Sequence, residues 1–523
     1  MTPRPLARRP PLPVVRGRAA PVGRGRTAGV ILGVAVALGL PAAASAHGLS
    51  PAYQSPLPLA VYLVGAAVTV GLSFVFILAR DLRAADAPPG RVVQVPAVLR
   101  FGLRAIGLVG WLWIVAQAFA GGSSDAAVGS LFLWVYGWVG IALLSAFLFP
   151  VWEWVDPFAT LHDVLAWLLR FVGLRGWEPS ELPSVARHWP ATLGLAFFVW
   201  LELVPVVSAS TLAVVLVGYT VLTLALMAQF GRDEWRAEGE TFTVWFRTLN
   251  RLAPFGVVAA SAVPGDPVPG AATWSGDDHE ERASDMAVER RGFATGLLRG
   301  PWSPAIVALI AIGVASIIFD GFSQTVVFAS QFGAPGLLPK TLLLVAWLTI
   351  VAGAALAVGR MVSIGAIGAG LLPIAVGYLT AHYLTYLLID GQRIVIAISD
   401  PLQQGSDMFG TAFFQPTGEW LPPGLVWTAQ LAAVVGGHML GAWAGHVTAQ
   451  RDMDAIAAER TRRDRRHRKV APGTPARRDV RLREVPLAVV MVALTTITLW
   501  SLGQAIVVET AAEGVAPAGL DGL

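Results

Sequence analysis

Long apolar stretches recur along the whole chain, and they limit its fold more than any other feature. A helix that crosses a bilayer needs about 20 mostly apolar residues, and backbone in lipid must satisfy its own hydrogen bonds. We therefore predict an all-α fold, a polytopic transmembrane helical bundle of about ten spans. The predicted spans are residues 57–80, 101–121, 128–150, 190–208, 211–231, 302–320, 336–358, 362–389, 424–447 and 486–508.

The composition indicates that the lipid bilayer is the main partner of this protein. Hydrophobic residues make up 55% of the 523 residues and charged residues only 14%, whereas soluble domains carry about 25% charged residues. Most arginines lie in short segments beside apolar stretches, which is typical of topology signals, so we predict no nucleic-acid partner. The chain has no cysteine, which excludes disulfides, thiolate metal sites and a cysteine nucleophile.

The N-terminus has the layout of a secretory signal peptide. An arginine-rich segment (4–26) precedes a short apolar core (28–40), and Ala44, Ser45 and Ala46 match a cleavage site. We predict a signal peptide over 1–46 and a single transmembrane helical domain over 47–523. Cleavage would leave His47 as the first residue of the mature chain. The alternative is an uncleaved signal anchor.

The distribution of arginine orients the predicted spans. Arginines concentrate in residues 80–104, 232–300 and 451–483, and short basic segments remain in the cytoplasm. The protein is therefore predicted in the plasma membrane as a multi-pass protein, with the mature N-terminus and the C-terminus extracytoplasmic. Residues 451–483 would form a basic cytoplasmic loop. Residues 261–300 are rich in proline, glycine and charge, which predicts a flexible cytoplasmic loop.

One apolar segment differs from the spans in its periodicity. Within 152–174 the apolar residues recur at steps of three and four, while His162, Asp163 and Arg170 interrupt them. This pattern predicts an amphipathic helix that lies at the inner membrane interface.

Polar residues inside the predicted spans are the first candidates for a site, because ionisable groups in lipid usually serve a function. Glu202 is one of them, and in lipid it must either be protonated or have a polar partner on another helix. His382, His438 and Met439 could together bind a metal ion. His438 lies among several glycines (436, 437, 441 and 445) that allow a neighbouring helix to approach closely. The alternative is that each histidine donates to a backbone carbonyl in a packed interface.

Acidic residues near the predicted outer ends of spans form a second group of candidates. Asp320, Asp390, Asp400 and Asp407 lie there beside glycine, serine and glutamine. Such clusters can bind a cation or a polar ligand, and they can equally cap helices and close turns. For Asp400 and Asp407 we favour the capping interpretation.

A series of stretches carries a family resemblance through nearly all of the mature chain. They are, in order, AHGL with PLPLAVYLVGAA, FVWLELV, QFGRDEWRAEGETFTVWFRTLNRLAPF, FDGFSQT, YLTAHYLTYLLIDGQ, ISDPLQQGSDMFGT and VWTAQLAAVVGGHMLGAWAGHVTAQRDM. In these stretches the chain resembles the bacterial polytopic membrane proteins called fenitrothion hydrolase. The resemblance implies hydrolysis of an organophosphate phosphotriester, and it implies no particular catalytic residues.

The sequence neither excludes hydrolysis nor contains a recognisable hydrolase motif. The sequence contains no HxH, H-E-x-x-H, G-x-S-x-G or P-loop pattern. A hydrolytic site would have to be assembled from separate helices, with His47, His382, His438, Asp320 and Asp390 as its candidates.

Two further functions fit the sequence. The amine and imidazole of a mature N-terminal His47 form a chelate suited to copper, or to another divalent metal. Alternatively, the intramembrane Glu202, His382 and His438 would line a polar path in a non-catalytic permease, or serve an assembly factor for another membrane complex. The expected ligand is thus a small molecule or a metal ion.

Overall fold

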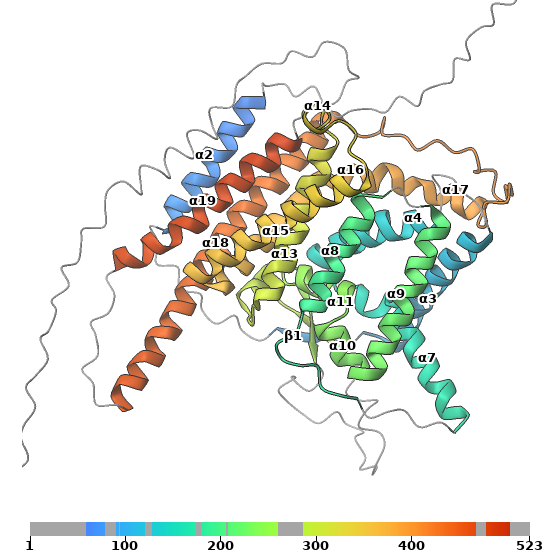
Figure 1. Ribbon diagram of the computed structural model, residues 1–523, viewed down its shortest axis with the longest axis horizontal. Coiled ribbons are helices and arrows are strands. Elements are labelled where there is room, and N and C mark those ends of the chain that lie inside the picture. The colour runs from blue at the N-terminus through green and yellow to red at the C-terminus, as the bar shows by residue number, and fades with distance from the viewer. Residues whose placement is uncertain are drawn as a thin grey trace, which may run out of the picture. The chain divides into compact units, whose positions relative to one another are not determined.

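The computed structural model describes residues 59–78, 90–93, 95–120, 128–173, 179–205, 208–259, 286–466 and 477–502. All of them belong to one compact unit, Pro51–Leu523 (Figure 1). The predicted signal peptide and His47 lie outside the described residues.

Helices make up most of the described chain, which agrees with the predicted all-α helical bundle. Many begin at a serine, threonine or carboxylate cap, as at Ser303, Thr325 and Ser363. In chain order the helices are α2 (Leu59–Leu78), α3 (Ala97–Ala120), α4 (Val128–Ser130), η1 (Leu131–Ile141), α5 (Ala142–Phe147), α6 (Trp152–Val155), α7 (Pro157–Phe171), α8 (Trp189–Leu203), α9 (Ala209–Phe230), α10 (Arg232–Glu238), α11 (Thr241–Asn250), η3 (Thr295–Leu298), α13 (Pro304–Ser323), α14 (Val326–Phe332), α15 (Leu337–Met361), α16 (Ile364–Asp390), η4 (Gly391–Arg393), α17 (Ile394–Ser399), α18 (Pro423–Arg466) and α19 (Arg477–Leu502).

Seven helical segments among the described residues are long and apolar enough to cross a membrane. The other three predicted spans also contain helices, namely α2, α8 and α19, and α8 has only 15 residues. The membrane class is therefore supported, while a count of about ten spans stays a prediction. The seven segments are Ala97–Ala120, Val128–Phe147, Ser210–Phe230, Pro304–Ser323, Leu337–Met361, Ile364–Ser399 and Pro423–Glu459.

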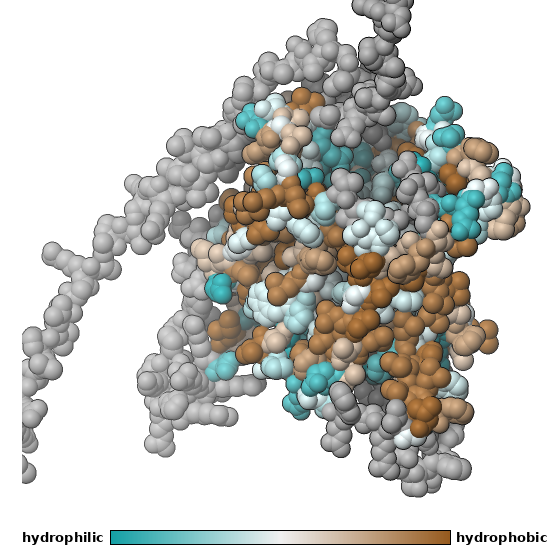
Figure 2. Space-filling view, turned by 45° about the vertical axis from the view of Figure 1, so that its right-hand side comes forward, coloured by the Kyte–Doolittle hydropathy of each residue, from teal (hydrophilic) through white to brown (hydrophobic). Residues whose placement is uncertain are grey.

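The core of the bundle is formed by α13 and α16, which are buried along most of their length. Helix α13 packs against α15, α16 and α8, and α16 packs most extensively against α18 (Figure 1). A helix that is apolar on every side is expected at such a central position. Apolar side chains also gather over much of the molecular surface in Figure 2, as expected where lipid replaces water.

Glycines bring α16 and α18 into close contact. A Cβ atom at Gly437 would lie 2.5 Å from the carbonyl oxygen of Pro373, and one at Gly441 would lie 2.4 Å from that of Gly370. At Gly436 a Cβ atom would meet nothing within 4 Å. The predicted close approach around His438 is thus confirmed at Gly437 and Gly441.

A small antiparallel sheet adds to the helices. Its strands are β1 (Arg91–Val93), β2 (Phe255–Ala259) and β3 (Met286–Arg290), in the order β1-β3-β2. The segment 261–300 is predicted to be a flexible loop, and its last part instead forms β3 and η3. Residues 261–285 lie outside the described residues. Strand β3 is held in place because it pairs with β1 and β2 and because its Glu289 accepts hydrogen bonds from the Gly90 N–H and from Arg299.

Two other segments singled out in the sequence also contain helices. Helix α18 continues to Arg466, so the first half of the basic loop predicted over 451–483 is instead an extension of that helix. Residues 152–171 form α6 and α7, and α7 leaves apolar side chains such as Val164, Leu165 and Leu168 exposed. The position of α7 at a membrane interface stays a prediction.

The bundle has two ends that differ in the elements they contain. The upper end is where α8, α13 and α16 finish and where α14 and α17 lie, and the lower end holds α10 and the sheet (Figure 1). The arginine pattern predicts that the upper end is extracytoplasmic.

Candidate functional site

Two helices, α13 and α16, bring polar side chains together near the upper end of the bundle. The Asp320 carboxylate, in the last turn of α13, lies 3.0 Å from His382 Nε2 and accepts a 2.8 Å hydrogen bond from the Tyr383 hydroxyl. Gln324 Nε2 donates to the other carboxylate oxygen at 2.7 Å. Both His382 and Tyr383 belong to α16. We call Asp320, His382, Tyr383 and Gln324 the acid–histidine cluster.

Glu202 adds a second carboxyl beside this cluster. It lies in the last turn of α8, which packs against α13. It interacts electrostatically with Asp320 and with Tyr383. Two candidates that the sequence suggested separately, Glu202 and Asp320, are therefore neighbours, because α8, α13 and α16 all end at the upper end of the bundle.

The hydrogen bonding of His382 determines what its ring can do. If Nε2 carries the proton and donates it to Asp320, then Nδ1 is left with a free lone pair. The described residues supply no hydrogen bond to Nδ1. The side chains of His382 and Asp320 are 16% and 13% exposed, so the pair is mostly buried but keeps some exposed surface. An imidazole oriented by a carboxylate is the usual form of a general base.

His438 and Met439 do not join the cluster. His438 is fully buried, and its Nδ1 atom bonds to Val434 O of its own helix at 2.8 Å, whereas Met439 is 45% exposed. The two side chains point to different sides of α18, so the predicted grouping with His382 is not formed. The described residues contain no group of three or more His, Asp or Glu side chains that could hold a metal ion. Copper binding would need His47, and it stays a prediction.

The remaining acidic candidates stabilise local structure. Asp400 accepts hydrogen bonds from Gln404 N and Gly405 N, and Asp407 accepts them from the Ser399 hydroxyl and Ala412 N. These bonds close turns, as the capping interpretation predicts. Hydrogen bonds, the one from Ala412 N–H first, also lower the pKa of Asp407.

Asp390 has a partner of its own. It forms an ion pair of 3.1 Å with Arg393, one turn further along the chain, and the pair lies where α16 passes into η4. Asp390 therefore lies at the upper end of the bundle, where it pairs with Arg393 rather than with the acid–histidine cluster.

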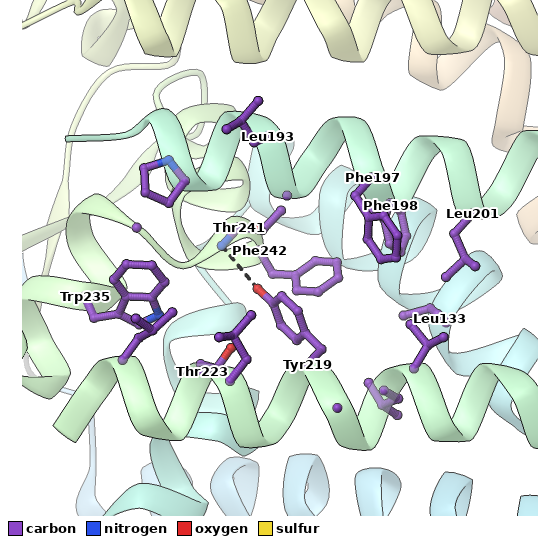
Figure 3. A pocket seen from close by; sticks show the side chains of 18 of the residues that line it. Leu133, Leu193, Phe197, Phe198, Leu201, Tyr219, Thr223, Trp235, Thr241 and Phe242 are labelled. Carbon is purple, nitrogen blue, oxygen red and sulfur yellow. Dashed lines mark hydrogen bonds between the residues drawn. The ribbon is translucent and has the colours of Figure 1, made fainter. Parts of the chain in front are cut away.

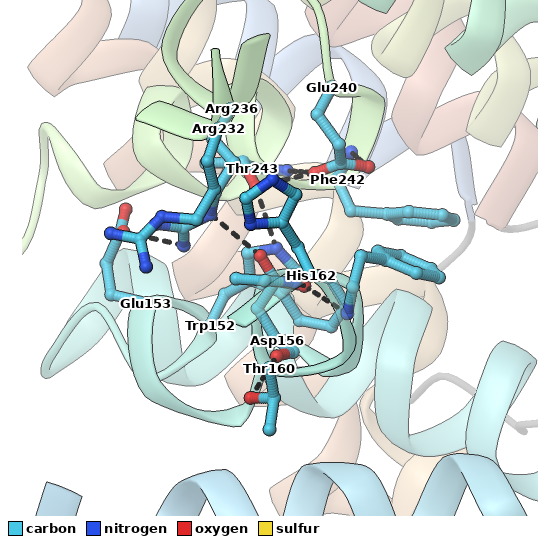
Figure 4. Close-up of polar contacts among 12 residues, drawn as sticks. Trp152, Glu153, Asp156, Thr160, His162, Arg232, Arg236, Glu240, Phe242 and Thr243 are labelled. Atoms are coloured by element: carbon cyan, nitrogen blue, oxygen red, sulfur yellow. Dashed lines mark hydrogen bonds and ion pairs between the residues drawn. The ribbon is translucent and has the colours of Figure 1, made fainter. Parts of the chain in front are cut away.

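A second polar cluster, which no sequence motif indicated, lies at the lower end (Figure 4). Arg236 of α10 donates to Asp156 at 2.8 Å and to Glu153 at 3.0 Å, and Arg247 of α11 also binds Glu153. The side chains of Glu153, Asp156 and Arg236 are only 3%, 1% and 5% exposed. In the sequence, these arginines indicate only the topology of the spans. The one signal in the sequence is the pair of acids in EWVDP, Glu153 and Asp156, which need positively charged partners if they are buried.

The charges in this lower cluster compensate one another. Burial alone would raise the pKa of Glu153, but the positive charges of Arg247 and Arg236 lower it to about 2. Asp156 also caps α7, because its carboxylate accepts from Phe158 N and Ala159 N. The cluster therefore joins the α6–α7 corner to α10 and α11, and it has a structural role.

No protein-family model, curated protein or solved structure matches the chain.

Proposed function

We propose that this multi-pass membrane protein is a hydrolase whose acid–histidine cluster acts on a small, apolar phosphotriester at the extracytoplasmic side. The observation that carries the proposal is the pairing of His382 with the buried carboxylate of Asp320. The resemblance to the fenitrothion hydrolase family supports the substrate class.

The proposed chemistry is general-base hydrolysis. His382 Nδ1 takes a proton from a water molecule while the water oxygen forms a bond to phosphorus. The bond from phosphorus to the leaving oxygen breaks, and the leaving group departs as an alkoxide or aryloxide. Asp320 orients the ring and stabilises the imidazolium that forms. The Tyr383 hydroxyl holds the same carboxylate oxygen that His382 contacts, which fixes the geometry of the pair.

Turnover of a nitrophenyl phosphotriester by the purified full chain tests this proposal. We expect His382→Ala to lower the rate by about 10²- to 10⁴-fold, the usual contribution of a positioned general base. Asp320→Asn should lower it as well, because the amide cannot stabilise an imidazolium. His162→Gln, at the lower end, serves as the control and should retain the wild-type rate. Absence of turnover in the wild type, or equal turnover in His382→Ala, would contradict the proposal.

A second candidate function is proton or cation transport, and the neighbouring carboxyls favour it. Pairs of acidic groups together with histidine inside a membrane commonly mark proton and ion pathways. Glu202 is not needed for the general-base step, but it would serve in such a relay. Proteoliposomes that contain a pH-sensitive dye distinguish the two functions. Proton movement lost in Glu202→Gln, without any phosphotriester turnover in the wild type, would favour transport.

A further inference from the structure

A cavity of about 600 Å³ lies between α8 and α9 (Figure 3). The two helices follow each other in the chain but pack on different neighbours, α8 on α13 and α11, and α9 on α3 and α10. The space between them is therefore not filled by helix–helix packing. We call it the α8–α9 slot.

The walls of the slot are almost entirely apolar, and its rim is exposed. Leu193, Phe197 and Leu222 line it and are 66%, 48% and 55% exposed, so the slot opens through an apolar part of the surface. Its lining on α9 runs from Leu212 to Leu226, which is about 21 Å along a helix. One acyl chain needs about 15 Å, half the thickness of a hydrocarbon core of ~30 Å.

The polar groups of the slot lie from its middle, at Tyr219, to its lower end, at Trp235, and they differ in how they are satisfied. The Tyr219 hydroxyl donates to Glu240 and accepts from Thr241 N (Figure 3). Trp235 also lines the slot, yet its buried indole Nε1–H has no hydrogen-bond partner among the described residues. A buried donor without a partner is costly. The fitting occupant is thus an apolar chain with an acceptor oxygen at the lower end.

We propose that the α8–α9 slot binds one acyl chain of a glycerophospholipid from the membrane leaflet at the lower end, with an oxygen of its ester group accepting from Trp235 Nε1. None of the residues that line the slot belongs to the acid–histidine cluster, so the proposal does not depend on the hydrolase function. Trp235 follows closely on the apolar segment Ser210–Phe230, and tryptophan is enriched at the polar boundary of a bilayer.

Lipid that co-purifies with the full chain tests the proposal directly. Gly218 lines the slot, and a Cβ atom there meets nothing within 4 Å, so Gly218→Leu fills the slot without strain in the helix. Gly353→Leu is the matched control, because Gly353 on α15 is equally open and does not line the slot. We expect stoichiometric phospholipid in the wild type and in Gly353→Leu, and its loss in Gly218→Leu. Equal lipid in all three proteins, or no lipid in the wild type, would overturn the proposal.

Two further measurements locate the lipid. A phosphatidylcholine with a photoreactive acyl chain should cross-link the wild type on α8 or α9, and cross-links confined to other helices would contradict the proposal whether or not Gly218→Leu folds. Trp235→Phe keeps the ring but removes the N–H, so it should weaken phospholipid binding about threefold to tenfold. An unchanged dissociation constant would exclude the hydrogen bond to the lipid. Release of a bound compound other than phospholipid would overturn the assignment of the occupant.

Discussion

Glu153 shows how much a single buried side chain can contribute at the lower end of this protein. Its carboxylate is shared by Arg236 and Arg247, and all three side chains are largely removed from solvent. A buried ion pair adds little net stability compared with an apolar replacement, but removal of one partner leaves an uncompensated charge. The residue is therefore sensitive to substitution and to protonation.

Acidic pH should destabilise the protein through this residue. The folded-state pKa of Glu153 is about 2 and its ordinary value is 4.5, so its contribution to stability is full above pH 4.5 and is lost as the pH falls toward 2. The shift corresponds to about 3 kcal/mol. We expect Glu153→Gln to lower the apparent Tm in detergent at pH 7, and the difference from wild type to shrink below pH 4.5. A difference that is constant across this range would show that charge is not the cause.

The α16–α18 pair shows how helix packing depends on single glycines. Their backbones approach closely because Gly377, Gly437 and Gly441 carry no side chain. Glycine in a helix interior costs about 0.5–1 kcal/mol relative to alanine, so its presence here is explained by packing rather than by helix propensity. His438 lies fully buried at the same contact.

Alanine substitution at two adjacent glycines separates these effects. Gly437→Ala places a methyl group against the Pro373 carbonyl, and we expect a loss of about 1–3 kcal/mol, the usual cost of overpacking. Gly436→Ala faces open space and should leave stability unchanged or raise it slightly. Thermal unfolding in detergent measures both. Equal destabilisation by the two variants would mean that the close approach of the helices does not contribute to stability.

At the scale of the whole molecule, the two ends of the bundle carry different chemistry. The upper end holds the acid–histidine cluster and the turns built by Asp400 and Asp407, and the lower end holds the lower cluster of acids and arginines, the sheet and α7. The arginine-rich lower end should face the cytoplasm. The side on which the proposed hydrolase meets its substrate depends on this orientation.

The absence of cysteine makes the orientation easy to test. We expect Ser406→Cys, at the upper end, to react in intact cells with a maleimide that cannot cross the membrane. Arg170→Cys, on the exposed side of α7, should react only after the membrane is disrupted. The reverse pattern would place the acid–histidine cluster on the cytoplasmic side and contradict the predicted topology.

Local patterns in the sequence determined the membrane class and the approximate positions of the helices. Hydropathy over about 20 residues acts within each segment, so it needs no knowledge of neighbouring segments. The same applies to the glycines near His438, whose small size indicated close packing, and to the turns at Asp400 and Asp407, whose hydrogen bonds stay within a few residues.

Only the tertiary structure decided which polar residues meet. The rotation of α13 and α16 about their axes pairs Asp320 with His382. The rotation of α18 places His438 in a different helix interface. The partners of Glu153 are more than 80 residues away along the chain, and β3 is ordered by pairing with two distant strands. Such contacts depend on how whole helices pack together, because a rotation of one residue position turns a side chain by about 100°.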